Sequence, residues 1–473
     1  MFETIRNAFK IKDVRKKIFM TILFVFLFRI GCYITVPGLN NISTALAADT
    51  TSKGMNIFGL LNSITGSALS QGTLFSLGIS PYINASIIVQ LLTVAIPALE
   101  RMSKEGDEGR EKINKITRWV TLVLAIISAV GIYLTLKDRY NYVDYTWLGG
   151  TGTVFYEFFS GTGAFEGSVA GEWVMGIYIV AMLVGGSMLV MWIGERITEY
   201  GVSNGISLII FVGIVATAAQ NLLTTLAGGF WIEALIFLVG LVLVFGFIVW
   251  VDGAERKIKV QYAKQVKGNK MYGGQSTFIP IKVNASGVMP LIFAYALLSF
   301  PSMIISTFWS GSNFDKWWNT YMTATNSTAT NGWVGVLVYN VSLAILIFVF
   351  AYFYSQIQFN PVEISRNIQN NGGFVTGIRP GRETAEYLAK VVSRITLWGA
   401  IFLAIIAFVP SILFSIPGWA GLRTAQLLVN SFSATGMLIC VSVALEFNKA
   451  LENQILMRHY KGLLGSNSKG FLK

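Results

Sequence analysis

Few residues of this chain have the types and spacing needed for catalysis or metal binding. The one histidine, His459, stands among basic residues near the C-terminus, and the two cysteines, Cys32 and Cys440, lie inside apolar runs. A structural zinc site needs His, Cys or carboxylate ligands in a group, and nucleophilic catalysis needs a nucleophile beside a base. The apolar runs offer neither, and nothing resembles a phosphate-binding or dinucleotide-binding motif. We therefore expect no catalytic residue, no cofactor and no metal, and predict that the chain is not an enzyme.

The spacing of the isoleucines suggests a sealing function instead of catalysis. Three apolar runs present them at helical spacing, with Ile79, Ile83 and Ile87 in one, Ile210 and Ile214 in the next, and Ile292 in the third. β-Branched side chains are stiff at the first torsion, so a ring of them would form a narrow, dry collar that repels ions by dewetting. For any single isoleucine, ordinary packing or contact with lipid explains the pattern equally well.

The elements that carry these isoleucines are predicted to be membrane-spanning helices. The chain has 473 residues, of which 53% are apolar and only 13% charged, whereas a soluble protein carries about a quarter charged residues. Backbone polar groups in lipid must be satisfied within each segment, which favours helices. We predict an all-α polytopic membrane protein with ten transmembrane helices, at about residues 18–36, 73–96, 117–136, 173–193, 206–226, 230–251, 286–308, 333–354, 395–416 and 427–446.

The basic residues give the direction of these spans. Of the 36 Lys and Arg residues, 30 fall in the N-terminus, the even-numbered connections and the tail, counting Arg118 at the edge of the third span, and only 5 in the odd-numbered connections. Cytosolic connections carry the excess of Lys and Arg. Both termini are therefore predicted to be cytosolic. Arg29 alone lies well inside a span, and we expect it to snorkel or to pair at the edge of the bundle.

A sequence repeat predicts two related halves. The second span contains GISP, with Gly78 and Pro81, and the seventh contains GVMP, with Gly287 and Pro290. Because the two motifs lie five spans apart, their spans cross the membrane in opposite directions. Interrupted spans at matching places in two halves of a chain indicate an inverted repeat. We predict pseudo-symmetric halves at residues 1–228 and 229–446, followed by a basic tail at 447–473. Chance recurrence of Gly and Pro is the alternative. The prolines also predict helices that bend or start late.

The scarcity of charged residues inside the predicted spans limits which transport functions this protein could have. A coupled transporter usually keeps ionisable groups at the midplane, and an ion channel needs a filter of carbonyls or a ring of charge. Neither pattern is present. An inverted-repeat secondary transporter of a small solute remains the alternative function.

The segment NIFGLLNSITGSALSQG, residues 56–72, is too short and too polar to cross a bilayer. It has apolar residues at helical spacing and a small polar face with two glycines, each of which costs a helix roughly 1 kcal/mol relative to alanine. We expect a weak, re-entrant helix, with an amphipathic helix on the outer membrane surface as the alternative.

Two cytosolic connections, at about residues 252–285 and 355–394, are long enough to fold. Residues 258–262 alternate apolar and polar side chains as a hairpin strand does. In the second connection, Gly and Pro flank Arg379 and fix the backbone around its guanidinium. Both connections resemble a docking platform for a cytosolic partner, although topology alone also explains the lysines of the first.

Several long motifs resemble the SecY family, the channel subunits of the bacterial protein-conducting translocon. The resemblance covers nearly the whole chain. It depends on FRIGCYITVPG (residues 28–38), SALSQGTLFSLGISPYINASIIVQLL (67–92), GERITEYGVSNGISLIIF (194–211), AERKIKVQYAK (254–264), GGFVTGIRPG (372–381) and LMRHYKG (456–462). Residues 432–439 depart from the usual FGGTSLLI of the family and read FSATGMLI, while keeping the isoleucine.

The resemblance implies a pore, a plug and a lateral gate. The implied pore ring is Ile79, Ile83, Ile210, Ile214, Ile292 and Ile439. The plug implied at about residues 58–70 includes Phe58, Leu61, Ile64, Gly66 and Ser70. The gate implied between spans 2–3 and 7–8 includes Ile87, Gln90, Ser207 and Asn284, and a hinge is implied near Gly228 and Gly229.

The resemblance also implies function and partners. Unfolded secretory polypeptides would pass through the pore, and transmembrane segments would leave sideways into lipid. Arg256 and Lys257, matching the basic tip of the loop between spans 6 and 7, and Arg379 would dock the SecA ATPase or the ribosome. SecE and SecG would complete a heterotrimer in the bacterial cytoplasmic membrane, and signal sequences and nascent chains would be clients.

Overall fold

The structure is a computed structural model that describes residues 8–37, 65–135, 169–262, 265–267, 270–272, 276–283, 289–308, 312–322, 332–415 and 434–468, with Arg6, Leu39 and Gly287. The predicted first half contains α2 (Lys12–Gly31), α5 (Ser80–Ala95), α6 (Pro97–Lys104), α7 (Asp107–Thr135), α10 (Val169–Tyr200) and α11 (Gly205–Ala227). The predicted second half contains α12 (Trp231–Asp252), α13 (Met289–Phe308), α14 (Asn313–Tyr321), α15 (Gly332–Gln358), α16 (Pro361–Asn370), α17 (Arg382–Ser415) and α19 (Ala434–Ser468).

Each of the ten predicted spans overlaps a helix of at least 16 residues, so the structure is mainly helical, as expected of the predicted membrane fold. Within the described ranges, five helices are long and apolar enough to cross a membrane by length and composition, or six if the bent pair α5 and α6 forms one span. That pair turns by 105° at Ile96. The bend follows from Pro97, which lacks an N–H and disfavours helical geometry in the preceding residue.

The second span starts later than the prediction of residue 73. Residues 65–79 form successive turns, and α5 begins only at Ser80. Gly78 adopts a left-handed φ of +54°, and Pro81 follows as the second residue of the helix. The same arrangement recurs before α13, where Gly287 has φ +64° and Pro290 is again the second residue. The late starts expected from the two prolines are therefore confirmed.

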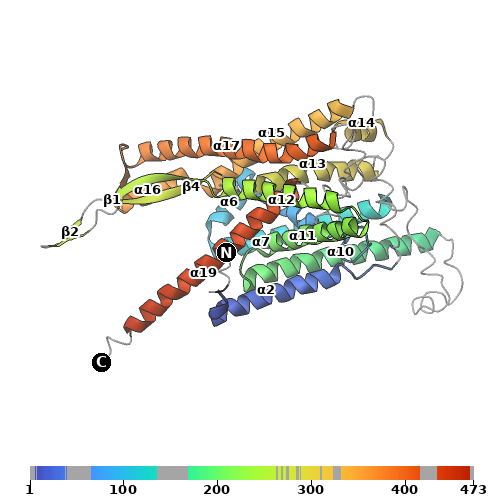
Figure 1. The fold of residues 1–473 in the computed structure, drawn as a ribbon, viewed down its shortest axis with the longest axis horizontal. Coiled ribbons are helices and arrows are strands. Elements are labelled where there is room, and N and C mark those ends of the chain that lie inside the picture. The colour runs from blue at the N-terminus through green and yellow to red at the C-terminus, as the bar shows by residue number, and fades with distance from the viewer. Residues whose placement is uncertain are drawn as a thin grey trace.

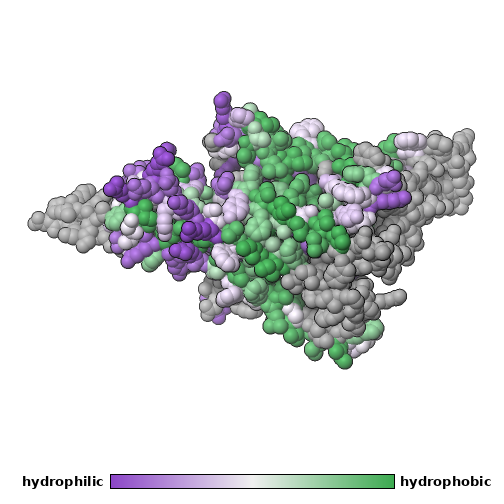
Figure 2. Space-filling view, turned by 90° about the horizontal axis from the view of Figure 1, so that it is seen from above, coloured by the Kyte–Doolittle hydropathy of each residue, from purple (hydrophilic) through white to green (hydrophobic). Residues whose placement is uncertain are grey.

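The helices lie roughly side by side in two groups (Figure 1). In the first group α5 packs against α7, and α10 packs against both α7 and α11. In the second group α15 lies between α13 and α17. Contacts of α13 with α5 and α7, and of α19 with α11, join the groups. Figure 2 shows a broad hydrophobic surface across the middle of the molecule, with hydrophilic surface gathered toward one end.

The two long connections that were predicted to be cytosolic fold together into one unit. Strand β1 (Glu255–Tyr262) pairs antiparallel with β4 (Ser276–Lys282) on one side and with β5 (Gly373–Val375) on the other. A small hairpin, β2 (Gln265–Lys267) with β3 (Lys270–Tyr272), extends from it. The predicted strand at 258–262 is confirmed, but its pairing with the connection after span 8 joins residues more than 100 positions apart.

This folded unit has its own apolar core. Alternate residues of β1, Ile258 and Val260, are buried, as the period of two predicts. They pack with residues of β4, β5, α16 and the N-terminal part of α17, among them Ile281, Val375, Ile368, Leu388 and Val392. A shared core makes the two connections one rigid platform rather than two loops.

Candidate pore and gate

All six isoleucines proposed for the pore ring meet in one apolar cluster. Four of them are almost fully buried, with exposed fractions of 2% for Ile79, 4% for Ile210, 1% for Ile214 and 3% for Ile439. Ile83 and Ile292 pack against this cluster. The members come from α5 and its preceding turn, α11, α13 and α19, so both halves of the chain contribute. Ile439 joins them despite the altered sequence before it.

The corner between α10 and α11 positions Ile210 and Ile214. Asn204 caps α11, its side-chain oxygen accepting a hydrogen bond from the backbone N–H of Ile206 at 3.1 Å. A β-carbon on Gly205 would lie 2.0 Å from the carbonyl oxygen of Gly194, so only glycine permits this close approach of the two helices. The capping side chain and the glycine explain why the motif GERITEYGVSNG precedes the isoleucines.

The predicted plug lies partly outside the described residues. Phe58, Leu61 and Ile64 fall in residues 40–64, of which nothing is described. From residue 65 to 70, where Gly66 and Ser70 lie, the chain forms turns rather than the expected helix. Gly66 and Ser67 both adopt left-handed geometry, with φ of +70° and 68°, which is incompatible with a right-handed helix. The helical prediction is therefore wrong for this part.

Hydrogen bonds hold residues 65–76 against the end of the first span. The N–H of Val36 donates to the carbonyl of Gly72, and the N–H of Leu74 donates to the carbonyl of Ile34, each at 2.8 Å. The hydroxyls of Thr73 and Ser76 donate to the carbonyl of Ala68 at 3.1 and 3.2 Å. These bonds define a seat, residues 65–76, that overlaps the C-terminal end of the proposed plug.

Arg29 lies at this seat and not at the edge of the bundle, where the sequence had placed it. Its guanidinium stacks on Tyr33 at 5.5 Å from the ring centroid. Its Nη1 atom lies 2.6 Å from the position of a β-carbon on Gly66, and the Cα of Gly213 in α11 lies 3.2 Å from the same position. Gly66 is thus held between a cation and the helix that carries Ile210 and Ile214. The seat therefore lies directly against the helix that supplies two of the proposed pore-ring residues.

The proposed gate residues do not form the expected polar cluster. Ile87 is buried with residues of α13 and α15 in a second apolar cluster. Gln90 accepts a short hydrogen bond at Oε1 from the hydroxyl of Tyr354 on α15, and its Nε2 donates to Ser86 Oγ at 3.4 Å. No hydrogen bond joins Gln90 to Ser207 within the described part of the chain, and Asn284 lies outside it.

Tyr354 is the gate contact that the sequence analysis missed. Its ring lies 4.9 Å from that of Phe293 on α13, and its hydroxyl crosses to α5. The sequence signal for this contact was the tyrosine hydroxyl in the apolar run FVFAYFYSQ, because a buried hydroxyl requires a hydrogen-bond partner.

The proposed docking residues lie on the folded unit formed by the two long connections, but not all where the resemblance placed them. Arg256 and Lys257 stand exposed at the beginning of β1, opposite Ile281 and Pro280 of β4. The far end of this connection is the β2–β3 hairpin, so the assignment of Arg256 and Lys257 to the tip is wrong. Both residues lie at the start of β1, just after the C-terminal end of α12. Lys257 also pairs with Glu255 at 3.3 Å.

Arg379 has the rigid frame that its neighbours predicted. The side chain is exposed, while Gly377 and Gly381 on either side adopt φ of +84° and +104°. The hydroxyl of Thr384 donates to the Arg379 carbonyl at 2.7 Å. These contacts fix the backbone and leave the guanidinium free to meet a partner.

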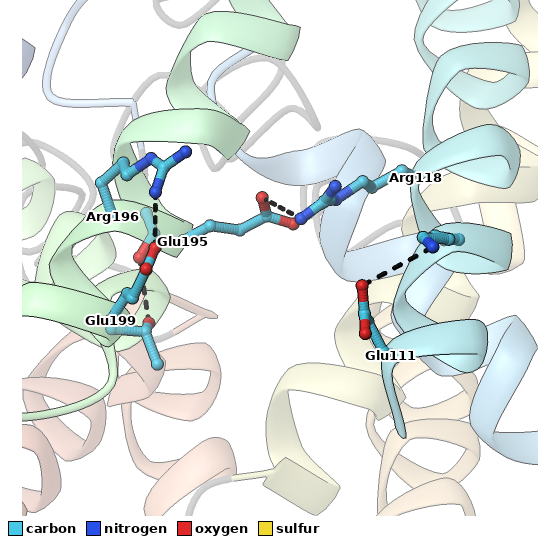
Figure 3. Close-up of polar contacts among 8 residues, drawn as sticks. Glu111, Arg118, Glu195, Arg196 and Glu199 are labelled. Carbon is cyan, nitrogen blue, oxygen red and sulfur yellow. Dashed lines mark hydrogen bonds and ion pairs between the residues drawn. The ribbon is translucent and has the colours of Figure 1, made fainter. Parts of the chain in front are cut away.

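A bidentate ion pair, also missed from the sequence, joins α7 to α10. The guanidinium of Arg118 contacts the carboxylate of Glu195 at 2.8 and 2.9 Å, and Arg196 pairs with Glu199 one turn further on (Figure 3). The Arg118–Glu195 pair fixes the third predicted span beside the fourth. Among the described residues, no group of three His, Cys, Asp or Glu side chains is placed to hold a metal ion.

Comparison with solved structures defines the class of protein. The chain has the fold of a protein-conducting channel: it matches "The structure of a protein conducting channel" with a TM-score of 0.61 and 18% identity, over 93% of this chain and 92% of the other. It also matches Sec61 in the canine ribosome-channel complex, with a TM-score of 0.59 over the same shares.

Sequence comparison then gives the family. The SecY family model matches residues 73–448. The protein translocase subunit SecY of Streptomyces coelicolor is 40% identical over 98% of this chain and all of its own length. That of Corynebacterium glutamicum is 41% identical over 97% of this chain and 99% of its own. The chain belongs to the SecY family.

Proposed function

We propose that this chain is the central pore-forming subunit of a protein-conducting channel. Unfolded secretory polypeptides pass through it across the bacterial cytoplasmic membrane, and transmembrane segments leave it sideways into lipid. The observation that carries this proposal is the convergence of six isoleucines from both halves of the chain on one apolar cluster. The relatives, which are translocase subunits, give no support to the alternative of a small-solute transporter.

The collar provides a seal that can still open. Its stiff apolar side chains leave no polar surface for ions to bind, so a closed collar excludes water and ions by dewetting. A translocating polypeptide parts the side chains and replaces their contacts with its own. The collar needs no specific hydrogen bonds to the client, which suits a channel that accepts many sequences.

The plug covers this collar on the side away from the cytosolic platform in the closed state. Residues 58–70 form the plug, and the seat at Arg29, Gly66 and Gly213 positions its C-terminal end beside α11. Two consecutive left-handed residues let the chain turn sharply out of the seat. Modest contacts permit the plug to leave when a polypeptide enters.

The lateral gate lies between α5 with α7 and α13 with α15, where the two halves pack together. Ile87, Gln90, Ser207 and Asn284 are its proposed residues, now with Tyr354. A hydrogen bond between membrane helices contributes about 1–2 kcal/mol. An apolar signal sequence offsets that contribution when it partitions between the separated helices. The halves at residues 1–228 and 229–446 turn at Gly228 and Gly229, the latter with φ +82°.

The cytosolic platform docks the energy source. Arg256, Lys257 and Arg379 meet the SecA ATPase or the ribosome, whose RNA attracts basic side chains through its phosphates. SecE and SecG complete the heterotrimer, and both termini of this chain lie in the cytosol. The basic platform, the tail and the N-terminus share that side, which supports this orientation.

Reconstitution tests the function directly. The chain is placed in lipid vesicles with SecE and SecG, and SecA, ATP and a secretory precursor are added outside. The proposal expects the precursor to become protected from protease only when ATP is present. Accumulation of a small solute without precursor transport would support the transporter instead and contradict the proposal.

A further inference from the structure

The short helix α14 is not part of the pore, the gate or the platform. We propose that its aromatic face is a membrane anchor, which lies in the boundary between headgroups and acyl chains of the leaflet opposite the cytosolic platform. This inference does not depend on what passes through the protein.

The aromatic face is continuous along α14. Phe314, Trp317 and Tyr321 are spaced by three and four residues and therefore share one side of the helix. The ring of Trp317 lies 6.1 Å from that of Phe314 and 5.8 Å from that of Tyr321. Half of Phe314 and 47% of Trp317 remain exposed, whereas Asp315, which points elsewhere, is only 4% exposed. A helix in water gains nothing from presenting such a face.

The position of α14 places this face at a membrane boundary. The indole N–H of Trp318 donates to Ser302 Oγ at 2.7 Å, toward the C-terminal end of α13. The carbonyl oxygen of Thr320 lies 2.2 Å from the position of a β-carbon on Gly335, in the first turn of α15. Both contacts are at the ends of predicted spans. Figure 1 shows α14 at the opposite end of the helices from β1 and β4.

A lipid-facing stripe begins directly beside α14. On α15, five apolar side chains at spacings of three or four residues are each about half exposed, namely Val334, Leu337, Val341, Ile345 and Val349. The stripe starts in the first turn of α15, where Gly335 packs against Thr320 of α14. This adjacency to an exposed apolar stripe favours lipid over a protein partner as the occupant.

The chemistry of the face suits the interface and not the bilayer centre. Trp and Tyr rings are amphipathic and gather at the level of the headgroups. Lys316, exposed between Phe314 and Trp317, can extend its ammonium group to phosphates or water. With nine residues, α14 is too short to span the membrane and must lie along its surface. Because α14 links α13 to α15, the anchor holds the ends of two gate helices at one depth.

Spin labels on α14 test the anchor in the complete complex in vesicles. A nitroxide is attached at Phe314→Cys or Trp317→Cys, with Lys316→Cys as the matched control on the same helix. Collisions with oxygen, which concentrates in lipid, are compared with collisions with a water-soluble nickel chelate. We expect the oxygen-to-nickel ratio at positions 314 and 317 to exceed that at 316 several-fold.

Two results would overturn the anchor. Low oxygen-to-nickel ratios at 314 and 317, equal to a low ratio at 316, would place the face in water. Low collision rates with both reagents would mean that protein covers it. If Trp317→Cys fails to fold, Phe314→Cys alone carries the test, since its side chain is half exposed. The unlabelled chain, whose Cys32 and Cys440 are buried, gives the background signal.

Discussion

The hydroxyl of Tyr354 on α15 donates a hydrogen bond to Oε1 of Gln90 on α5, and this bond joins the two halves of the chain. It crosses the seam that we propose as the lateral gate. Because Tyr354 also packs on Phe293, both α13 and α15 are tied to the second span through one side chain.

Replacing Tyr354 with phenylalanine should loosen the closed gate. Loss of about 1 kcal/mol shifts the closed-to-open ratio roughly 5-fold toward open. Export of precursors with weakened signal sequences should rise accordingly. Tyr352→Phe is the matched control, because its hydroxyl donates to the Ser393 carbonyl within the same half. Equal effects of the two variants would show that the Gln90 bond does not hold the gate.

Gly66→Ala should raise the resting ion leak of the closed channel. A β-carbon there meets Arg29 Nη1 at 2.6 Å and Gly213 Cα at 3.2 Å, and left-handed φ costs a non-glycine residue about 1–2 kcal/mol. The plug seat must therefore shift. Conductance across a planar bilayer measures the leak. Gly106→Ala controls for backbone strain, since its φ is +81° but nothing lies within 4 Å. A leak no larger than that of Gly106→Ala speaks against the seat.

The sequence predicted the positions of the helices and the shared face of Ile79 and Ile83 because local rules govern both. Apolar runs of sufficient length predicted the helices, and Gly78 with Pro81 predicted the late start of α5. The helical spacing of Ile79 and Ile83 placed them on one face, and the structure brings them to Ile214 and Ile439.

What sequence reasoning missed depends on contacts between distant residues. Pairing of Val260 with Val375 has no local signal, so the sheet that joins the two connections was not predicted. The turns at residues 65–70 contain the left-handed Gly66 and Ser67, and hydrogen bonds of Gly72 with Val36 and of Leu74 with Ile34 hold the residues that follow. The helical spacing of the apolar residues gave no sign of these contacts. The Gln90–Tyr354 bond likewise joins positions that only the folded chain brings together.

Reversing the charge of Arg379 should impair SecA-driven secretion more than insertion of membrane proteins. The framed guanidinium of Arg379 is free to meet a partner, and Arg379→Glu would repel an acidic surface. Arg382→Glu is the control, since Arg382 is exposed nearby but already pairs with Glu386 at 3.1 Å. Transport and insertion are measured on the same vesicles. Equal loss of both activities would indicate a role of Arg379 in folding.

Lys282→Gln should raise the melting temperature slightly, by about 1–2 °C. Burial and the adjacent ammonium group of Lys449 lower the pKa of Lys282, and Asp252 and Glu255 oppose this shift only in part. The folded state therefore binds this proton less tightly than the unfolded state, so the charged lysine destabilises the fold at neutral pH. The cost falls as pH rises through the lowered pKa and vanishes above the unfolded value of about 10.4.

Thermal unfolding of the purified complex at several pH values measures this effect. The difference between wild type and Lys282→Gln should be largest near neutral pH and should shrink at alkaline pH. A constant difference would mean that the substitution acts through packing and not through charge.

Crosslinking of a stalled polypeptide to the collar tests the central claim most directly. Cys32→Ala and Cys440→Ala first remove the native thiols, since Cys440 lies in the same apolar cluster. A secretory precursor with one cysteine is then stalled during translocation in chains carrying Ile83→Cys, Ile214→Cys or Ile292→Cys. Val123→Cys is the control, because Val123 lies 53% exposed on the outer surface of α7. We predict disulfides at the collar positions and none at Val123. Crosslinks that miss every collar position and form at Val123 or elsewhere would contradict the account.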